Sequence, residues 1–253
     1  MKNEIKYFCF NTVIPVRAEY KDQSEIITQM VFGEVAELLE THNQWRKILI
    51  VHDNYEGWID GKQVIEISDE EFEFWKKNQY KQTDFLSKWS SSLGVFNSLR
   101  GANIPNNSKF KVGQYTFERV GSYDRFPNKD ISSIALSYLN SPYLWGGKTP
   151  FGIDCSGFTQ AVYRFLGVNL PRDAYQQAEV GEEVKFEDRK IGDIVFFHNS
   201  KNKIIHVGIL LEDDKFIHAS GRVRVDKLTD KGIVHSENGQ LTHNLTIIKR
   251  LLH

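Results

Sequence analysis

The chain has 253 residues, of which 40% are hydrophobic, and its 32 basic and 33 acidic side chains give a formal charge of -1. Such a balance produces no surface field of one sign, so neither a nucleic acid nor an anionic membrane is expected as a partner. The length allows about two domains with substantial cores. With only Cys9 and Cys155, the chain is not a disulfide-built scaffold, and both thiols are expected to be free.

Residues 1–22 alternate apolar and charged side chains. They contain no uninterrupted apolar run of the kind that a signal peptide or a membrane span requires. A cytoplasmic location is therefore expected, or a periplasmic or surface location if residue 1 follows a removed signal. The sequence does not predict an oligomeric state.

Short apolar segments separated by polar turns occupy residues 13–67. They are VIPV, IITQMVF, EVAELLE, WRKILIV and GWID. Strands at such close spacing are typical of a small β-barrel or sandwich, so residues 1–67 are predicted to form one domain. The following SDEEFEFWKKN has a capping serine, Ser68, acidic residues in its first turn and lysines at its end, which predicts a linker helix. A second small β-module is predicted within residues 68–125.

A further domain is predicted over residues 126–253. Its first helix lies in NKDISSIALSYLNS, with a possible cap at Asn128 or Asp130 and apolar residues at the spacing of one helix face. These apolar residues are Ile131, Ile134, Ala135 and Tyr138. Four strands rich in isoleucine, valine and phenylalanine follow later, in IGDIVFF, KIIHVGILL, DKFIHAS and NLTIIKRLL. Helices followed by a run of strands predict an α+β fold.

Between these elements, CSGFTQAVYRFLG predicts a helix whose first turn contains Cys155 and whose end is capped by Gly167. Its apolar face consists of Phe158, Ala161, Val162, Phe165 and Leu166. A thiol at a helix start meets unsatisfied N–H groups and the positive end of the helix dipole, which favour the thiolate. The sequence therefore predicts a nucleophilic cysteine, whereas a lone intracellular cysteine is more often a small core residue.

Two histidines could complete such a site. His206 lies inside an apolar strand, an unusual position for an imidazole unless it faces a specific partner, and His218 lies on the next predicted strand. Together with Cys155 they predict a triad of nucleophile, base and orienting residue. No zinc-ligand spacing occurs, and Pro142 stands where a phosphate-binding loop would need glycine, so no metal or cofactor is expected. His198, His235 and His243 are interpreted as loop residues.

Five segments, PYLWGGKTPFGIDCSGFTQ, LPRDAYQQ, GDIVFF, IIHVGILL and FIHAS, resemble the NlpC family of papain-like cysteine peptidases in order and spacing. The resemblance covers about residues 126–253. It implies a helix with an N-terminal cysteine packed on an antiparallel sheet, with Cys155 as nucleophile, His206 as base and His218 as the polar third member. It also implies that Tyr143 stabilises the oxyanion and that Trp145 contacts the substrate, although both aromatic residues could simply pack under the helix.

The N-terminal segments resemble a bacterial SH3-like domain, and this combination resembles the γ-D-glutamyl-L-diamino-acid endopeptidases of the dipeptidyl-peptidase VI type. The resemblance implies hydrolysis of murein peptides that have a free N-terminal L-alanine, as in cell-wall peptide recycling. Asp154, Ser156, Glu25 and Tyr55 are the residues it implies around the substrate amine, and Ala174 replaces a serine that is common in relatives. Glu25 and Tyr55 could equally be an ordinary solvated loop residue and a barrel residue.

Two other functions remain open at this stage. The SH3-like module could bind wall polymer or a protein, with the catalytic domain secondary. Alternatively, the papain-like domain could hydrolyse another amide or transfer the acyl group to an amine, because this fold supports several reactions.

Overall fold

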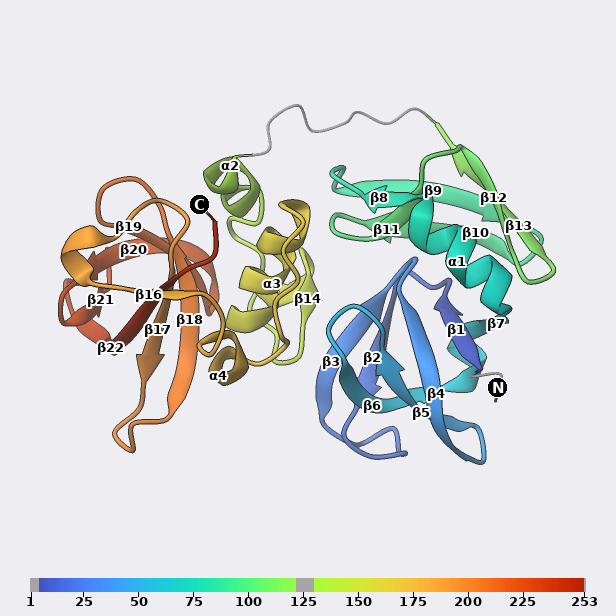
Figure 1. The fold of residues 1–253 in the computed structure, drawn as a ribbon, viewed down its shortest axis with the longest axis horizontal. Coiled ribbons are helices and arrows are strands. Elements are labelled where there is room, and N and C mark those ends of the chain that lie inside the picture. Colours follow the sequence, from blue (N-terminus) through green and yellow to red (C-terminus); the bar gives the residue numbers. More distant parts are fainter. Residues whose placement is uncertain (1–4, 122–129, 253) are drawn as a thin grey trace. The chain divides into compact units, whose positions relative to one another are not determined.

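The computed structural model describes residues 5–121 and 130–252 (Figure 1). The chain divides into two compact units, Met1–Pro127 and Asn128–His253. The predicted division after residue 125 lies outside the described residues. None of the helices in the described ranges has the length and apolar character needed to cross a bilayer.

Seven strands form the larger sheet of the first unit, in the order β3-β2-β6-β5-β4-β1-β7. Each neighbouring pair is antiparallel. All five apolar segments predicted as strands are strands, while β1 and β7 lie outside those segments. The strands are β1 (Lys6–Cys9), β2 (Val13–Arg17), β3 (Ile26–Val31), β4 (Val35–His42), β5 (Trp45–Ile50), β6 (Tyr55–Asp60) and β7 (Val64–Ile67), with a short 3-10 turn, Gly61–Gln63, before β7.

The predicted linker helix is confirmed as α1 (Asp69–Lys77). Ser68 caps it in a capping box, in which the Ser68 Oγ accepts from the Glu71 N–H and the Glu71 carboxylate accepts from the Ser68 N–H. Residues 79–120 then form a four-stranded sheet of order β10-β9-β13-β12 and a two-stranded ladder of β8 and β11. These strands are β8 (Gln79–Lys81), β9 (Leu86–Ser91), β10 (Gly94–Leu99), β11 (Asn103–Pro105), β12 (Lys109–Val112) and β13 (Tyr115–Val120).

An aromatic cluster joins the parts of the first unit. Phe8 of β1, Trp75 of α1, Trp89 of β9 and Phe110 of β12 are buried in one hydrophobic core. Phe8 and Trp75 meet edge to face with ring centroids 4.9 Å apart, and Trp89 and Phe110 do so at 5.4 Å. Because this core takes residues from both sheets and from α1, the β-strands after the helix are packed into the same compact unit as the first sheet.

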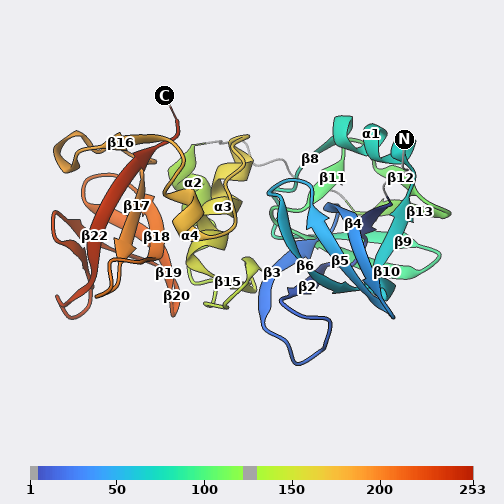
Figure 2. The same cartoon turned by 60° about the horizontal axis from the view of Figure 1, so that its bottom comes forward.

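The second unit contains a sheet of order β16-β22-β17-β18-β19-β20-β21, and β22 also pairs with β21. That pairing closes β17 to β22 into an antiparallel barrel, seen from two sides in Figures 1 and 2. The four predicted strands are confirmed as β17, β18, β19 and β22. The strands are β16 (Glu182–Val184), β17 (Ile194–His198), β18 (Ile204–Leu210), β19 (Lys215–Ser220), β20 (Arg222–Thr229), β21 (Gly232–Val234) and β22 (Leu241–Arg250).

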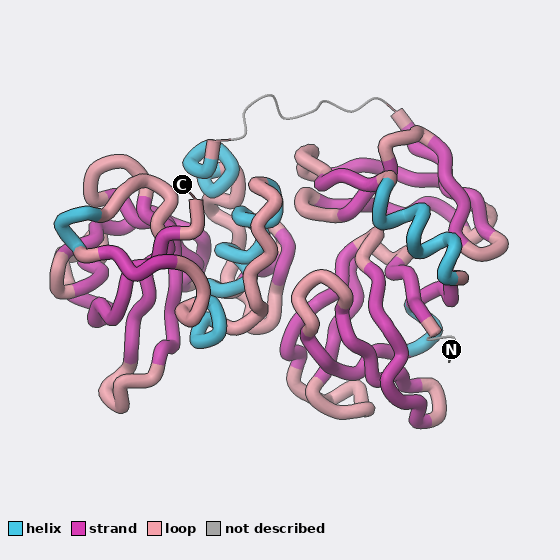
Figure 3. Tube along the Cα trace, viewed as in Figure 1, coloured by secondary structure: helices cyan, strands magenta, loops and turns pink. Residues whose placement is uncertain are grey.

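Short helices cover one side of this barrel (Figure 3). Helix α2 (Ile131–Leu136) begins at Asp130, whose carboxylate accepts from the Ser133 N–H, while the alternative cap, Asn128, lies outside the described residues. Helix α3 (Cys155–Phe165) ends before Gly167, whose φ of 81° makes it the predicted left-handed cap. The remaining elements are β14 (Lys148–Thr149), β15 (Gly152–Ile153), α4 (Ala174–Gln177) and a 3-10 turn, Phe186–Asp188.

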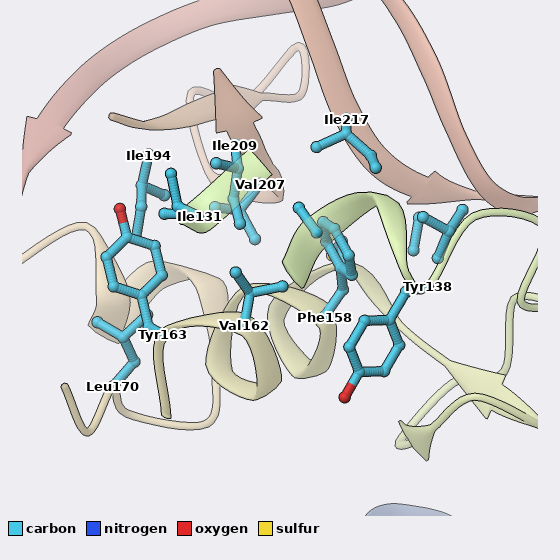
Figure 4. Close-up of a cluster of buried hydrophobic side chains, with 14 of the residues drawn as sticks. Ile131, Tyr138, Phe158, Val162, Tyr163, Leu170, Ile194, Val207, Ile209 and Ile217 are labelled. Carbon is cyan, nitrogen blue, oxygen red and sulfur yellow. The ribbon is translucent and has the colours of Figure 1, made fainter. Parts of the chain in front are cut away.

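Helix α3 packs its apolar face against the barrel. Figure 4 shows Phe158 and Val162 of α3 among Val207 and Ile209 of β18 and Ile217 of β19. The predicted α+β fold with a helix on an antiparallel sheet is therefore confirmed, and the closure of that sheet is an addition. The packing sets the start of α3, and with it Cys155, against strand β18.

Candidate active site

Glycines allow the start of α3 to approach the preceding turn closely. Cys155 is the first residue of the helix, and the Asp154 carboxylate caps it by accepting from the Gly157 N–H at 2.7 Å. A Cβ on Gly157 would lie 2.3 Å from the Gly147 carbonyl oxygen, and a Cβ on Gly147 would lie 2.3 Å from that of Gly152. No larger residue fits at these two positions without moving the backbone, so the glycines of WGG and CSG fix the geometry around the cysteine.

A buried ion pair anchors the cap. Arg172 is 1% exposed and donates to both carboxylate oxygens of Asp154, from Nη1 to Oδ1 at 3.0 Å and from Nη2 to Oδ2 at 2.6 Å. The Gly146 N–H also donates to Oδ2, at 2.8 Å. Such a planar two-point contact is the strongest form of the arginine–carboxylate pair. The pair therefore links the LPRD segment to the start of the catalytic helix.

Asp154 and Ser156, which were predicted to bind the substrate amine, are thus engaged within the chain. The Ser156 Oγ accepts from Arg172 at 2.9 Å, and the Asp154 oxygens take donors from Gly146, Gly157 and Arg172. An ionised carboxylate offers about four acceptor positions, and these donors already fill them. Their role toward a substrate amine stays a prediction, but their role in holding the helix start is direct.

The Cys155 thiol is buried, with the residue 6% exposed. The backbone N–H groups of Val207 and Ser156 act on its Sγ and favour the thiolate, which places the sulfur near Val207 of β18. Burial, followed by the neighbouring Asp154 carboxylate, raises the pKa of the Cys155 thiol to about 12. Burial and this like charge work against the thiolate that was expected at the helix start, so the sulfur needs a base to take its proton.

The two histidines predicted for the site contact each other through their ring nitrogens. His206 of β18 and His218 of β19 are buried, and the His206 Nε2 lies 2.7 Å from the His218 Nδ1. Gly208 stands opposite His218 across the two strands, and a Cβ on Gly208 would lie 2.7 Å from that of His218. The glycine therefore makes room for the second imidazole. Burial, followed by the neighbouring His218, lowers the pKa of His206 well below its usual value, so His206 is a neutral imidazole.

Asp226 of β20 extends this pair. Its Oδ2 lies 3.0 Å from the His218 Nε2 and 3.0 Å from the Arg224 Nη2, and its Oδ1 accepts from the Ser236 N–H at 2.9 Å. Burial opposes ionisation of Asp226, but the hydrogen bonds from His218 and Ser236 hold the pKa of its carboxyl below the usual range. The site thus contains a permanent buried carboxylate on the far side of His218.

His243 lies in strand β22, so its interpretation as a loop residue is wrong. Its ring stacks on that of His206, with centroids 4.4 Å apart and an angle of 26° between the planes. Burial lowers the pKa of His243 to about 4. His198 is also a strand residue, the last of β17, whereas His235 lies in a loop as expected. The strand register, which a single sequence does not show, decided these positions.

Tyr143 lies in the segment that leads into α3. Its N–H donates to the Gly221 carbonyl oxygen at 2.9 Å, and it forms a bridge with Ile153, two residues before Cys155. Burial, followed by the charges of Cys155 and Asp154, raises the pKa of Tyr143 to about 12. Its phenol is therefore a neutral donor near the sulfur. Trp145 is 61% exposed, so the alternative that it packs under the helix does not hold.

Three further residues were connected with the substrate amine in the sequence. Glu25 is exposed and Tyr55 is half-buried, and both belong to the first unit. Ala174 is the first residue of α4, directly after the capping Asp173. Their roles toward a substrate amine stay predictions.

Sequence reasoning missed several residues of the site. These are Arg172, Gln177, Arg224, Asp226 and the stacking role of His243. Gln177 donates to the Ser156 carbonyl oxygen at 3.0 Å and accepts from the Thr159 hydroxyl at 2.6 Å, so it ties α4 to α3. An arginine inside the apolar-flanked LPRD was the one available signal. Among the described residues, no group of histidine, cysteine and acidic side chains is arranged to hold a metal.

A helix-start cysteine set against a barrel strand, with a buried histidine pair on that strand and the next, defines the protein class. The protein is a hydrolase, a cysteine peptidase with a papain-like catalytic unit preceded by an SH3-like domain. Residues 140–240 match the model of the NlpC/P60 family, and residues 16–64 match that of the bacterial dipeptidyl-peptidase SH3 domain.

The chain belongs to the NlpC/P60 family. It is 29% identical to the gamma-D-glutamyl-L-lysine dipeptidyl-peptidase of Bacillus subtilis, over 77% of this chain and 72% of that protein. The Bacillus cereus protein of the same name is 27% identical, over 85% of this chain and 74% of that one. The gamma-DL-glutamyl hydrolase of B. subtilis is 46% identical over 51% of this chain and 32% of its own length.

The fold is also shared with a solved structure. An NlpC/P60 family protein from B. cereus superposes with a TM-score of 0.77 and 21% identity, covering 97% of this chain and 99% of that one. At 21% identity, this similarity shows a shared fold.

Proposed function

We propose that the protein is a γ-D-glutamyl-L-diamino-acid endopeptidase that acts on murein-derived peptides. The observation that carries the proposal is similarity across both units to the gamma-D-glutamyl-L-lysine dipeptidyl-peptidases, together with the cysteine and histidine pair described above. The gamma-DL-glutamyl hydrolase matches over about half of the chain and adds support for a γ-glutamyl bond as the substrate.

The proposed reaction begins with proton transfer, because the resting thiol is protonated and the imidazole is neutral. His206 takes the proton from Cys155 as the sulfur attacks the γ-carbonyl carbon of D-glutamate. The resulting tetrahedral oxyanion collapses, His206 gives the proton to the leaving amine, and a thioester remains on Cys155. Water, deprotonated by His206, then attacks the thioester and releases the glutamyl product and the thiol.

Two features of the site suit this reaction. Tyr143 keeps its phenolic proton, because its pKa is raised to about 12, and can donate a hydrogen bond to a developing oxyanion. The first turn of α3 also presents N–H groups beside the sulfur. Both are donors that stabilise negative charge on the carbonyl oxygen in the transition state more than in the bound substrate.

The test is cleavage of L-Ala-γ-D-Glu-L-Lys and of the meso-diaminopimelate peptide, with product masses determined. Cys155→Ala should lower turnover on the order of 10⁵-fold or more. Cys9→Ala is the matched control, because Cys9 is the other buried cysteine and lies in strand β1 of the first unit. Normal turnover by Cys155→Ala would refute the mechanism, and a transfer product instead of the free acid would replace hydrolysis by acyl transfer. An α-linked D-Glu peptide should not be cleaved.

We further propose that the substrate needs a free N-terminal L-alanine and that cleavage takes place on released peptides in the cytoplasm. The relatives' name supports the first point, because a dipeptidyl-peptidase removes two residues from a free N-terminus. Acetylating the substrate's alanine should then block cleavage, and equal rates on both peptides would remove this requirement while leaving the cysteine chemistry intact. Cell fractionation tests the location.

A further inference from the structure

Three neighbouring strands of the barrel each contribute one residue to a polar chain. Gly208 of β18 stands opposite His218 of β19, and His218 stands opposite Arg224 of β20. His206 and Asp226 are each two residues from those partners, so both lie on the same face of the sheet as His218, at diagonal positions. The side chains form a row of hydrogen bonds. The His206 Nε2 lies 2.7 Å from the His218 Nδ1, and the His218 Nε2 lies 3.0 Å from the Asp226 Oδ2.

The chemistry of the groups dictates where the protons of this chain lie. A carboxylate only accepts, and Arg224 and the Ser236 N–H, which also contact Asp226, only donate. The His218 Nε2 must therefore carry the proton that faces Asp226. Burial lowers the pKa of His218, so the ring is neutral and its Nδ1 is an acceptor. The His206 Nε2 then carries the proton of the next bond, and the His206 Nδ1 is left as the basic nitrogen.

We propose that Asp226 is a positioning residue that fixes the proton positions on both histidines, so that His206 presents an unprotonated Nδ1 for the cysteine proton. The inference rests on the proposed function in that it makes His206 the base. Asp226 touches no reacting atom and acts through His218. Without its carboxylate, Arg224 is the donor left beside the His218 Nε2, and the bonds of the chain reverse. The His206 Nδ1 would then be protonated and could not accept the thiol proton.

The charged and titratable groups around His206 give the carboxylate a second effect. His206 meets His218 from β19 and the stacked ring of His243 from β22, and Arg224 of β20 lowers its pKa further. These neighbours are neutral or positive, so they disfavour the imidazolium that forms during turnover. Asp226 supplies the negative charge behind His218 that offsets Arg224.

The first measurement uses the wild-type protein. Nitrogen-15 NMR of the histidine rings at neutral pH should show a protonated Nε2 and an unprotonated Nδ1 on both His206 and His218. Signals are assigned with His206→Gln and His218→Gln. A protonated Nδ1 on His206 in the wild-type protein would overturn the proposal without any variant at Asp226.

The second measurement uses Asp226→Ala. The proposal expects the His206 Nδ1 to become protonated and kcat to fall on the order of 100-fold, with KM nearly unchanged. Asp226→Glu should restore part of the activity. The matched control is Asp193→Asn, which breaks another buried aspartate–arginine pair in the same unit, with Arg250 at 2.8 Å. Unchanged ring protonation in Asp226→Ala, or an equal loss in Asp193→Asn, would overturn the proposal.

The alkylation rate of Cys155 with iodoacetamide separates this inference from the proposed substrate. Alkylation needs thiol deprotonation but no peptide, so in protein that carries Cys9→Ala, where Cys155 is the remaining thiol, adding Asp226→Ala should slow it. If the protein failed to cleave γ-glutamyl peptides while this slowing held, the substrate proposal would fall and the positioning role would stand. If the protein cleaved γ-glutamyl peptides but Asp226→Ala did not slow alkylation, the positioning role of Asp226 would be refuted and the proposed substrate would remain.

Discussion

The two units differ in how many charged residues and imidazoles they bury beside their apolar cores. The first has an aromatic core in which Phe8, Trp75, Trp89 and Phe110 pack edge to face or tilted, and a separate aliphatic core in its larger sheet, with Glu34 as its one fully buried acidic residue among those described. The second unit packs α3 on a barrel through aliphatic residues, and it also buries charged residues and imidazoles beside that packing. These are Lys148, Asp154, Arg164, Arg172, Asp193, His206, His218 and Asp226.

This difference separates burial that stabilises the fold through apolar packing from burial of charged groups around the active site. An aromatic cluster stabilises through area and ring contacts and needs no exact partner for each atom. A buried charge costs free energy unless its partners are present, so the buried ions of the second unit depend on specific neighbours. The first unit is therefore expected to tolerate repacking, whereas the second is expected to fail when single partners are removed.

The largest effect is expected from Arg172→Met. It leaves the Asp154 carboxylate buried without its partner, and the second unit should lose about 3–5 kcal/mol of unfolding free energy. Hydrogen exchange measured separately over each unit is the readout. Arg222→Met is the matched control, because Arg222 meets Glu237 at 3.6 Å on the surface, and it should cost less than about 1 kcal/mol. Equal losses in both variants would contradict the dependence of the second unit on buried partners.

Phe110→Ala is expected to cost the first unit about 3–5 kcal/mol, because Phe110 is buried among Phe8, Trp75 and Trp89. Phe110→Leu should recover most of that loss, in keeping with a tolerant apolar core. Phe74→Ala, at a position 57% exposed in the same unit, is the control and should change stability by under about 0.5 kcal/mol. A loss with leucine as large as with alanine would contradict the tolerance expected here.

Acid should destabilise the second unit through its neutral histidines. The folded pKa of His243 is about 4, below the usual 6.5, so the unfolded chain binds more protons as the pH falls through that window. Stability is fully present above pH 6.5 and is lost toward pH 4, by at most about 1.4 kcal/mol per pH unit for each histidine that stays neutral. His243→Gln should flatten this slope in urea titrations of the second unit. A slope unchanged by His243→Gln would contradict the shifted pKa.

A small effect is expected at the start of α1. Ser68→Ala removes the hydroxyl that accepts from the Glu71 N–H and should cost the first unit about 1 kcal/mol. Ser92→Ala, at an exposed turn residue, is the control and should be neutral. If both serines behave alike, the capping box adds nothing to the stability of this unit.

Local signals in the sequence accounted for much of the fold. Ser68 and Asp130 begin helices where their side chains predicted, and Gly167 ends α3 in the left-handed conformation. The predicted apolar segments of both units are strands, because alternating apolar residues and short apolar runs in the sequence indicate a strand. The short strands β16 and β21 lack such runs and were not predicted, and β20 was missed although its RVRV alternates.

The site divides in the same way. Cys155 at a helix start and the two strand histidines stood out as unusual residues at their places in the sequence, and the structure brings His206 and His218 together. Arg172, Asp226 and His243 did not stand out, because a charged or polar residue on an amphipathic segment is ordinarily solvated. Only their burial reveals what they contact.

The sequence by itself indicated the class of the protein and its SH3-like unit through the resemblance of ordered segments, and the residue types of its chemistry through their local spacing. The tertiary structure alone decided the protonation of those residues. A pKa depends on burial and on charges that reach the group through other strands, and the barrel register, not the order of residues along the chain, brings those charges to Cys155 and His206.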